Sequence, residues 1–361
     1  MDTYRCDVMI VGAGPAGSAA AIALKQRHPD LEVVLIDRRE FPRDKVCGDG
    51  LGPGVVRVLR ELDLLDVVSN ALKPTAVRIG GPGHEEGYSE GPYVRGRDLS
   101  GFVLPRLEFD ARLVARAKAL GVELLEQHQA ISTAIDGDRR RVVVRAENGQ
   151  EDAFCPRLLI AADGAYSAMR ISLIGSRPDK KYIHLASRAY ATIEYGTRYP
   201  YNEHSLRIDF ENDLLPAYGW VFPTSASTAN IGVGIPIDVM QAKHLNPRTL
   251  LEQYLGSLQE RGISATFNVP QLGHQLPHAA HMPQLAHERA VLIGDAGSMI
   301  NPFSGEGIAY AMDASLMLAE RFKLSQLSSN PVFIKQWEHD YRKKYAHHFQ
   351  SAWIADRSEG F

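Results

Sequence analysis

Three short motifs rich in small residues follow one another in a fixed order along this chain of 361 residues. The first is Gly12-Ala-Gly-Pro-Ala-Gly17, the second is Ala162-Asp-Gly-Ala-Tyr-Ser167, and the third joins Gly294-Asp-Ala296 to Asn301-Pro-Phe-Ser-Gly-Glu-Gly307. A lone GxGxxG motif is weak evidence, because glycine turns occur in every fold class. Three segments that each suit a different part of one dinucleotide predict an α/β fold built around that ligand.

The first motif lies in the context that dinucleotide binding requires. Residues Cys6–Val11 predict a buried strand, Ser18–Arg27 a helix and Glu32–Asp37 a second strand, which together form a βαβ unit. Its glycines turn the chain, admit a pyrophosphate close to the backbone and let the helix pack on the strand. The alternative is a glycine turn kept for packing alone. The residues expected to bind the cofactor here, and in the loop that follows, are Gly12, Gly14, Pro15, Ala16, Gly17, Asp37, Arg38 and Arg43.

The two later motifs supply acids and glycines that complete an FAD site. Asp163 follows a strand expected at Leu158–Ala161, where ligands bind in α/β folds, although an ordinary turn aspartate fits the same pattern. Asp295 is placed to accept hydrogen bonds from ribityl hydroxyls, and a helix expected over 305–322 stabilises negative charge on a reduced flavin. Arg106 either reaches the cofactor or is an exposed capping residue. The further residues expected to bind FAD are Arg106, Asp163, Gly164, Asp295, Pro302, Gly305, Glu306 and Gly307.

Two segments point toward the substrate. The glycines around the acid at 47–50 predict a tight loop near the flavin, with Cys47 and Gly48 beside the cofactor. Cys47 there either donates a proton and shapes the pocket or is simply a small buried residue. In the strand-like segment 218–223, alternation sends three aromatic side chains to one face, which either walls an apolar tunnel or packs in the core. These candidate substrate-contacting residues are Tyr218, Trp220 and Phe222.

The composition excludes several classes of protein. A net charge of −3 gives no reason to expect nucleic-acid binding, and no stretch reaches the length of a membrane span. Three scattered cysteines and the absence of a signal peptide predict a cytoplasmic protein. The histidines from 274 to 287 lie in a segment broken by prolines, so no metal site is expected. Peripheral membrane contact stays open, because the basic and aromatic helix expected at Lys335–Phe349 is either solvated or docked on a membrane surface.

Segments that carry cofactor chemistry alternate with segments that carry none. The simplest architecture is a discontinuous, Rossmann-like FAD-binding lobe, interrupted by a β-rich substrate lobe and closed by C-terminal helices. The expected limits are 1–75, 103–180 and 271–325 for the FAD-binding domain, 76–102 and 181–270 for the substrate-binding domain, and 326–361 for the C-terminal helical segment.

On these motifs the chain resembles the group-A flavin-dependent monooxygenase superfamily, whose fold is that of p-hydroxybenzoate hydroxylase. Within it, residues 42–50 (PRDKVCGDG), 218–223 (YGWVFP) and 301–307 (NPFSGEG, with serine in place of threonine) resemble the geranylgeranyl reductase family. The resemblance implies that the three aromatic residues contact a prenyl chain and that Cys47 lies near the flavin and the reacting double bond. Halogenases of this fold typically carry WxWxIP at the corresponding segment, so halogenation is disfavoured.

The resemblance implies an FAD-dependent reductase of C=C bonds in a prenyl or similarly apolar chain, with hydride delivered from the reduced flavin. The alternative is a monooxygenase, in which reduced flavin reacts with O2 to hydroxylate or epoxidise an aromatic or natural-product substrate; the fold alone cannot decide. Since the chain has one GxGxxG and no second Rossmann unit, either NAD(P)H binds transiently or another protein supplies the electrons. A non-enzymatic flavin-binding protein is disfavoured, because it leaves the ring-side loop at 301–307 unexplained.

Overall fold

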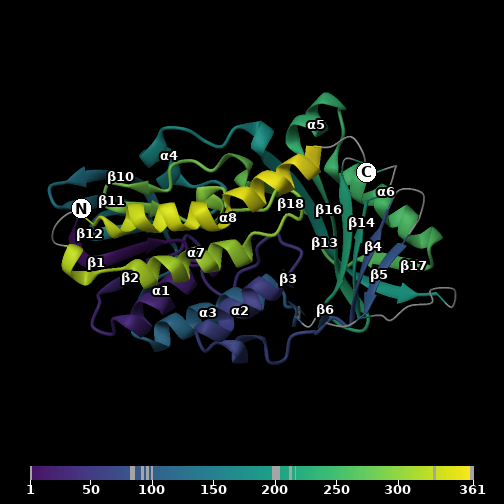
Figure 1. Ribbon diagram of the computed structural model, residues 1–361, viewed down its shortest axis with the longest axis horizontal. Coiled ribbons are helices and arrows are strands. Elements are labelled where there is room, and N and C mark those ends of the chain that lie inside the picture. Colours follow the sequence, from purple (N-terminus) through teal and green to yellow (C-terminus); the bar gives the residue numbers. More distant parts are fainter. Residues whose placement is uncertain are drawn as a thin grey trace.

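Within the residues that the structure describes, the chain forms two large β-sheets placed side by side, with helices around them (Figure 1). Strands of the first sheet come from early, central and late parts of the sequence, and strands of the second sheet come from the segments between them. This arrangement confirms the predicted Rossmann-like lobe interrupted by a β-rich lobe. The computed structural model describes residues 2–81, 86–90, 93–94, 97–98, 101–196, 204–210, 214–215, 217–327 and 331–357.

The first sheet has a parallel centre flanked by an antiparallel hairpin. Its strands are β1 (Thr3–Val11), β2 (Val33–Ile36), β9 (Glu123–Leu125), β10 (His128–Asp136), β11 (Arg139–Ala146), β12 (Glu151–Ala161), β19 (Ala286–His287) and β20 (Ala290–Leu292). They follow the order β10-β11-β12-β1-β2-β9, and β20 pairs with the second half of β12. β1 is parallel to both neighbours, with Val8 level with Val33 on one side and Leu158 on the other. The loops after β1, β2, β12 and β20 therefore meet at one sheet edge.

The first helix, α1 (Pro15–Arg27), begins three residues before the expected Ser18. Gly14 is its N-cap and Pro15 stands at the first helical position, where a missing N–H costs nothing. The helix is buried from Pro15 to Lys25, because it packs against α3 (Arg106–Ala119) and α7 (Ile308–Arg321).

Gly17 determines how closely α1 approaches β1. A Cβ atom at Gly17 would collide with the carbonyl oxygen of Gly12 and press on the side chain of Ile10. We therefore expect Gly17→Ala to lower the free energy of unfolding by about 1–3 kcal/mol, since overpacking forces helix and strand apart. Urea unfolding measures the loss, with Gly256→Ala as the control, because nothing lies within 4 Å of a Cβ added there. A Gly17→Ala protein as stable as the wild type would contradict this.

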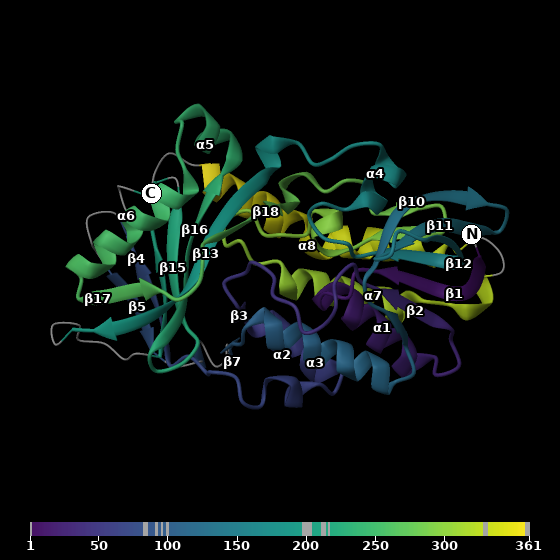
Figure 2. The ribbon, with the colours of Figure 1, turned by 180° about the vertical axis from the view of Figure 1, so that it is seen from behind.

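The second sheet turns one face to the first lobe and is covered on the other face by helices α5 (Ile237–Ala242) and α6 (Pro247–Glu260) (Figure 2). Its strands are β4 (Ala76–Gly80), β5 (Glu86–Glu90), β13 (Ile183–Tyr195), β14 (Ser205–Asp209), β15 (Tyr218–Pro223), β16 (Thr228–Pro236), β17 (Ile263–Phe267) and β18 (Leu272–Pro277). They follow the order β17-β13-β16-β15-β14-β4-β5, and β18 also pairs with β13. The sheet thus continues beyond residue 271, while the expected domain limits stay a prediction.

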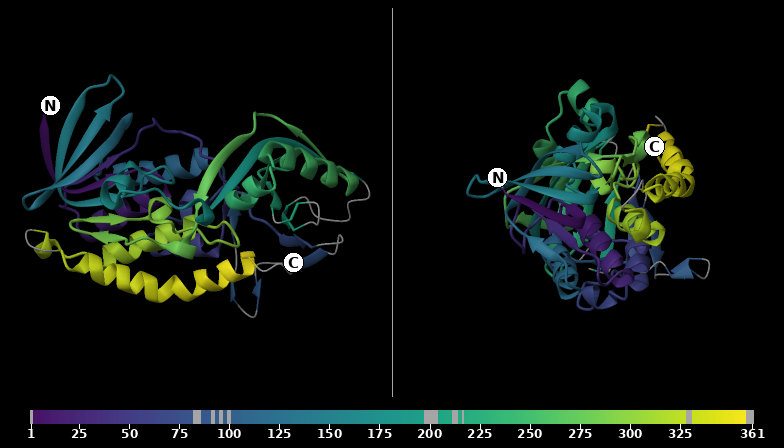
Figure 3. Two further views of the ribbon diagram at one scale, coloured as in Figure 1. Left: turned by 90° about the horizontal axis from the view of Figure 1, so that it is seen from above. Right: turned by 90° about the vertical axis from the view of Figure 1, so that its left-hand side faces the viewer.

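A long C-terminal helix, α8 (Phe333–Arg357), runs along the molecule from the first lobe to the second (Figure 3). Trp337 Nε1 donates to the Ala314 carbonyl on α7, and Arg357 at the far end pairs with Asp238 of α5 at 2.7 Å. The helix therefore ties the two lobes together. None of the helices in the described part of the chain is long and apolar enough to cross a membrane. The remaining α-helices and strands of the described residues are α2 (Pro53–Glu61), α4 (Ala168–Ile174), the pair β3 (Gly50–Leu51) and β8 (Phe102–Val103), and the pair β6 (Tyr93–Val94) and β7 (Arg97–Asp98).

Candidate active site

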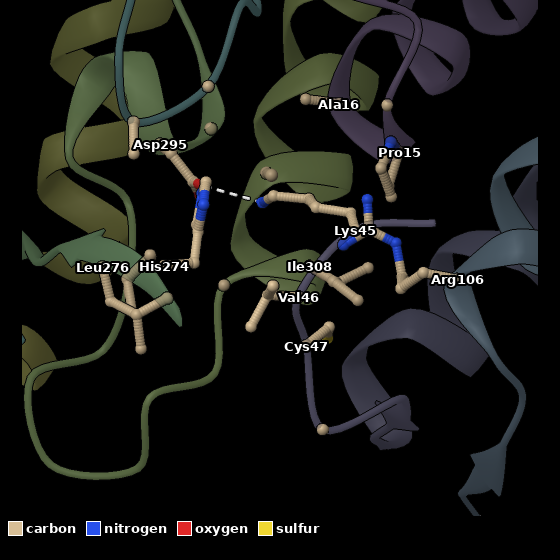
Figure 4. A pocket seen from close by; sticks show the side chains of 18 of the residues that line it. Pro15, Ala16, Lys45, Val46, Cys47, Arg106, His274, Leu276, Asp295 and Ile308 are labelled. Atoms are coloured by element: carbon tan, nitrogen blue, oxygen red, sulfur yellow. Dashed lines mark hydrogen bonds and ion pairs between the residues drawn. The ribbon is translucent and has the colours of Figure 1, made fainter. Parts of the chain in front are cut away.

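A cavity of about 1140 Å³ is lined by residues of both lobes. Its polar part comes from the glycine loop and from the loops that follow β2, β12 and β20. Its apolar part comes from the inner face of the second sheet. Figure 4 shows the polar part, where Lys45 extends toward Asp295, Arg106 enters from the opposite side below Pro15, and Cys47 lies below both.

The glycine loop after β1 forms one wall of the polar part. Gly12 has a φ of 99°, in the left-handed region, and its N–H donates to the Ile36 carbonyl at 2.8 Å. A Cβ atom at Gly14 would instead meet only the guanidinium nitrogens of Arg43 and Arg106, at 3.8 and 3.9 Å. The space before Gly14 is thus bounded by two cations and by the N-terminal end of α1. This set of donors suits a diphosphate.

A chain of ion pairs fixes both guanidinium groups in front of the glycine loop. The Asp37 carboxylate accepts from the Ala13 N–H at 3.0 Å and pairs with Arg43 at 3.1 Å. Arg43 also pairs with Asp110 at 3.1 Å, and Asp110 pairs with Arg106 at 2.6 Å. Arg106 is 2% exposed, so the alternative of an exposed capping arginine is wrong. The cavity is lined by Gly12, Gly14, Pro15, Ala16, Asp37, Arg38, Arg43 and Arg106, whereas Gly17 is not part of its lining.

Asp163 and Gly164 line the cavity just after β12, and Asp163 also closes a turn. Its carboxylate accepts from the Ser167 hydroxyl at 2.5 Å and from the Met169 N–H at 3.1 Å, where α4 begins. Burial raises the pKa of the Asp163 carboxyl. Gly164 has a φ of 78° and no atom within 4 Å of an added Cβ, so it leaves this edge of the cavity open. Asp163 therefore combines the two roles that the sequence left as alternatives, a turn residue and a cavity wall.

Asp295 lies in the turn after β20 and forms an ion pair with Lys45 at 2.9 Å (Figure 4). Burial acts to raise the pKa of Asp295, but Lys45, His274 and Arg106 outweigh it and hold the pKa below its ordinary value. Burial and the nearby Lys45 lower the pKa of His274 to about 4. At neutral pH this corner of the cavity therefore holds a charged Asp295 carboxylate and a neutral His274 imidazole.

The loop at 301–307 brings backbone groups to the cavity before α7 begins. The helix begins at Ile308 and not at 305 as expected, because Gly305 has a φ of 68° and Gly307 is the N-cap. The Asn301 side chain holds the loop by accepting from the N–H groups of Phe303 and Ser304, at 2.9 and 3.0 Å. Of the four residues predicted here, Gly305, Glu306 and Gly307 line the cavity, and Pro302 is buried outside its lining.

Cys47 is half-buried in the cavity wall, on a loop held against the second sheet. Its carbonyl accepts from Asn230 Nδ2 at 2.7 Å, and its side chain interacts with the Arg106 guanidinium. Gly48 permits the close approach, since a Cβ there would lie 3.2 Å from the ring of Phe222 and 3.3 Å from Trp220 Nε1. The cysteine loop is thus in contact with both lobes.

The three aromatic residues of β15 share the inner face of the second sheet. Tyr218, Trp220 and Phe222 line the cavity, as the period of two predicts. Between them, Gly219 faces α6, where an added Cβ would collide with the ring of Tyr254. Tyr218 reaches across to the first lobe, so that a Cβ on Gly305 would collide with its hydroxyl. The apolar lining continues with Val77, Ala186, Leu206, Ile208 and Leu276.

Several polar residues of the site had no assigned role in the sequence. Lys45 and Asp49 lie inside the cysteine motif, which was a signal that could have identified them. Tyr190 and Asn230 bind Asp49 from positions 141 and 181 residues further along the chain, and nothing local marks them. Among the described residues, no three His, Cys, Asp or Glu side chains are grouped so that they could hold a metal ion.

Known proteins resemble this chain over most of its length. A family model described as an FAD binding domain matches residues 5–325. Menaquinone reductase from Mycobacterium tuberculosis is 33% identical over 324 residues, which cover 87% of this chain and 76% of that protein. Digeranylgeranylglycerophospholipid reductase 1 from Methanopyrus kandleri is 27% identical over 362 residues, covering 96% and 88%. A geranylgeranyl bacteriochlorophyll reductase-like structure from Thermoplasma acidophilum has a TM-score of 0.85 at 21% identity, covering 98% and 87%. The myxobacterial chondrochloren halogenase shares the fold with a TM-score of 0.76 at 18% identity, covering 96% and 82%.

An FAD-binding model that spans nearly the whole chain, and a cavity that runs between its two lobes, make this protein a flavin-dependent oxidoreductase. More narrowly, the chain belongs to the geranylgeranyl reductase family of the FAD-dependent monooxygenase-like superfamily, as the cysteine loop and the aromatic strand implied. The cavity fits FAD on its own chemistry. A backbone cradle at Gly14 that a side chain would fill faces two fixed guanidinium groups, and carboxylates stand at Asp37 and Asp295 for hydroxyl groups.

Proposed function

We propose that this protein reduces carbon–carbon double bonds in the polyprenyl chain of a lipid, with reduced FAD as the hydride donor. The observation that carries the proposal is one continuous cavity with a polar part suited to the cofactor and an apolar part suited to a hydrocarbon. Its volume of about 1140 Å³ exceeds the roughly 300–1,000 Å³ of ordinary ligand sites. Menaquinone and digeranylgeranylglycerophospholipid, the molecules in the relatives' names, both carry polyprenyl chains.

The residues that would hold FAD follow from the contacts of the polar part. Gly14 and the first turn of α1 would bind the diphosphate between Arg43 and Arg106, and Asp37 would bind ribose hydroxyls. Asp163, Asp295 and the backbone of Gly305 to Gly307 line the rest of the polar part. When bound and reduced, FAD supplies a hydride at its N5 atom.

The second sheet would hold the substrate. Trp220, Phe222 and Ile208 present a dry wall against which a prenyl segment can lie flat, and burying each of its carbon atoms is favourable. The same wall keeps water from the reduced cofactor. Such a surface acts mainly by orienting the alkene, because the reacting atoms must be held about 3–3.5 Å apart.

Cys47 is the proposed proton donor. As hydride reaches one alkene carbon, the Sγ–H bond breaks and its proton forms the new C–H bond at the other carbon, which leaves a saturated bond and a thiolate. The Arg106 guanidinium, which interacts with the Cys47 side chain, stabilises that thiolate until solvent returns the proton. NAD(P)H is the proposed source of electrons, bound transiently because this chain has one dinucleotide motif.

The decisive experiment is performed without oxygen. The FAD-loaded protein is reduced with one equivalent of dithionite and mixed with a geranylgeranyl lipid that has no quinone ring. We expect the flavin to reoxidise and the lipid to gain 2 Da, as atom balance requires. Menaquinone and its saturated-chain analogue are compared separately, because the quinone ring alone can reoxidise flavin. Reoxidation only after oxygen is admitted, with an oxygenated product, would replace this proposal with the monooxygenase.

The apolar part can be blocked without touching the cofactor residues. We expect Ile208→Trp to retain FAD but to lower kcat/KM for the prenyl lipid by about 10-fold or more, since an indole would occupy the place of several carbon atoms. Ile135→Trp is the control, because Ile135 is exposed on β10 of the first lobe. Equal kcat/KM in the two variants would mean that the substrate does not lie along β14.

Peripheral membrane contact is part of the same proposal, because polyprenyl lipids reside in membranes. Sedimentation of the protein with lipid vesicles tests it, with and without a polyprenyl lipid in the bilayer. Protein that stays in the supernatant in both cases would remove membrane contact from the proposal.

A further inference from the structure

Asp49 is a fully buried carboxylate at the junction of the two lobes, and no step described above uses it. Its oxygens accept from the Tyr190 hydroxyl on β13 at 2.6 Å and from Asn230 Nδ2 on β16 at 2.7 Å. They also accept from the backbone N–H of Arg106, the first residue of α3, at 3.2 Å. One carboxylate therefore joins the cysteine loop to two strands of the second lobe and one helix of the first.

Two of these donors also hold Cys47, by separate routes. Asn230 Nδ2 donates to the Cys47 carbonyl at 2.7 Å as well as to Asp49. Arg106 binds Asp49 through its backbone, and the charge of its guanidinium acts on the Cys47 side chain. Loss of the Asp49 carboxylate would therefore loosen both the backbone and the thiol of Cys47.

The same network fixes the aromatic wall. Asn230 Oδ1 accepts from Trp220 Nε1 at 3.0 Å, while its Nδ2 serves Cys47 and Asp49. Rotating the Asn230 amide by 180° would exchange its donor and acceptor and break all three contacts. Asn230 and Asp49 are both 0% exposed, so water cannot replace a lost partner cheaply.

We propose that Asp49 is the positioning residue of this site, whose carboxylate sets the place of the Cys47 thiol relative to the wall formed by Trp220. The inference rests on the proposed function for its catalytic consequence. Its structural consequence, the order of the cysteine loop, stands without it.

The charges around Asp49 determine how the positioning depends on pH. The charged Arg188 and the hydroxyl of Tyr190 face it from β13, Arg106 on α3 contributes its backbone N–H, and Asn230 on β16 is neutral. Burial raises the pKa of Asp49 to about 6, although the hydrogen bonds from Tyr190 and Asn230 act to lower it. Above that pH the charged carboxylate accepts from all its donors. Below it, the added proton removes the negative charge that strengthens the hydrogen bonds from Tyr190, Asn230 and Arg106, so the network loosens as the pH falls.

Asp49→Asn tests the inference, because it keeps the size of the side chain and removes the charge. In the FAD-free protein, we expect faster hydrogen–deuterium exchange in the loop at residues 44–50. In the FAD-loaded protein, we expect kcat for prenyl reduction to fall about 100-fold with KM nearly unchanged, as a misplaced group costs on this order.

The pH dependence gives a second test. The wild-type kcat should fall as the pH drops through about 6, and Asp49→Asn should lack that inflection. Tyr190→Phe should move the inflection to higher pH, because it removes a donor that stabilises the charged form.

Asp209→Asn is the matched control. Asp209 is also 0% exposed and accepts from a tyrosine, Tyr254, at 2.6 Å, but on the α6 side of the second sheet. Asp209→Asn should leave the hydrogen–deuterium exchange of the loop at 44–50 and the pH dependence of kcat as in the wild type. In a Cys47→Ala background, Asp49→Asn should cost little more activity, since its effect acts through the thiol.

The inference would be overturned if the loop of Asp49→Asn exchanged hydrogen for deuterium at the wild-type rate. It would also be overturned if the variant kept the pH inflection of the wild type. If that variant does not fold, Tyr190→Phe makes the test in a milder form, because it removes one hydrogen bond to Asp49 and leaves the bonds of Asn230 to Cys47 and Trp220 in place; an unchanged pH inflection and unchanged loop exchange in Tyr190→Phe would then overturn the inference. If the wild type reduces no prenyl lipid, the proposed function fails while the exchange data still decide whether Asp49 orders the loop.

Discussion

Replacing Gly14 with valine should give a folded protein that no longer retains FAD. The backbone at Gly14 has a φ of −72°, which valine adopts without strain, and an added Cβ meets no atom closer than 3.8 Å. The new side chain would instead fill the space between the glycine loop and the guanidinium groups of Arg43 and Arg106. Overlap with a diphosphate there costs about 3 kcal/mol or more, so affinity should fall by on the order of 100-fold or more.

Flavin absorbance after gel filtration and calorimetric titration of the FAD-free protein measure this effect. Gly256→Val is the control, because Gly256 is exposed on α6 and has open space around it. Normal flavin content in Gly14→Val would show that the diphosphate does not bind at the glycine loop. Loss of flavin together with loss of the folded state would point to packing, and Gly17→Ala provides the reference for that outcome.

Replacing Cys47 with alanine should leave FAD binding intact and slow prenyl reduction by about 10²–10⁴-fold, the range expected when a general acid is removed. The loop itself should persist, because Asn230 binds the Cys47 carbonyl, which alanine keeps. The measurement is the rate of flavin reoxidation by the prenyl lipid in the absence of oxygen, at saturating substrate.

Cys155→Ala is the control for this substitution, since Cys155 is buried in β12 of the first sheet, away from the cavity lining. An unchanged rate in Cys47→Ala would reduce Cys47 to a residue that shapes the pocket. A slower rate that external thiols or small acids restore would strengthen its assignment as the proton donor.

The fold leaves the chemistry open, because halogenase and reductase-like structures share it with this chain at 18% and 21% identity. The features that distinguish a prenyl reductase from the other enzymes of this fold are the inner face of the second sheet and the loop that faces it. Tyr218, Trp220 and Phe222 present aromatic carbon to the same cavity that Cys47 enters. The proposed prenyl reduction would need such a pairing of an apolar wall with the proposed proton donor.

The sequence by itself determined the cofactor class, the family and the lobe order of this protein. Those properties depend on short contiguous segments, in which Gly12 and Gly305 adopt a positive φ that few other residues tolerate and Gly14 leaves space in front of the backbone. The alternation in β15 was also readable, since a period of two needs only the strand itself.

Only the tertiary structure decided which polar groups surround the reacting centre. Lys45 meets Asp295 across 250 residues of chain, and Asp49 meets Tyr190 and Asn230 across 141 and 181. No local pattern marks such partners, because distant segments of the chain bring them together only when the sheets and their loops pack around one cavity. The burial of Arg106, which overturned the interpretation of Arg106 as an exposed capping residue, has the same origin, because the cysteine loop at Asp49 and the glycine loop at Gly14 approach it from distant parts of the chain.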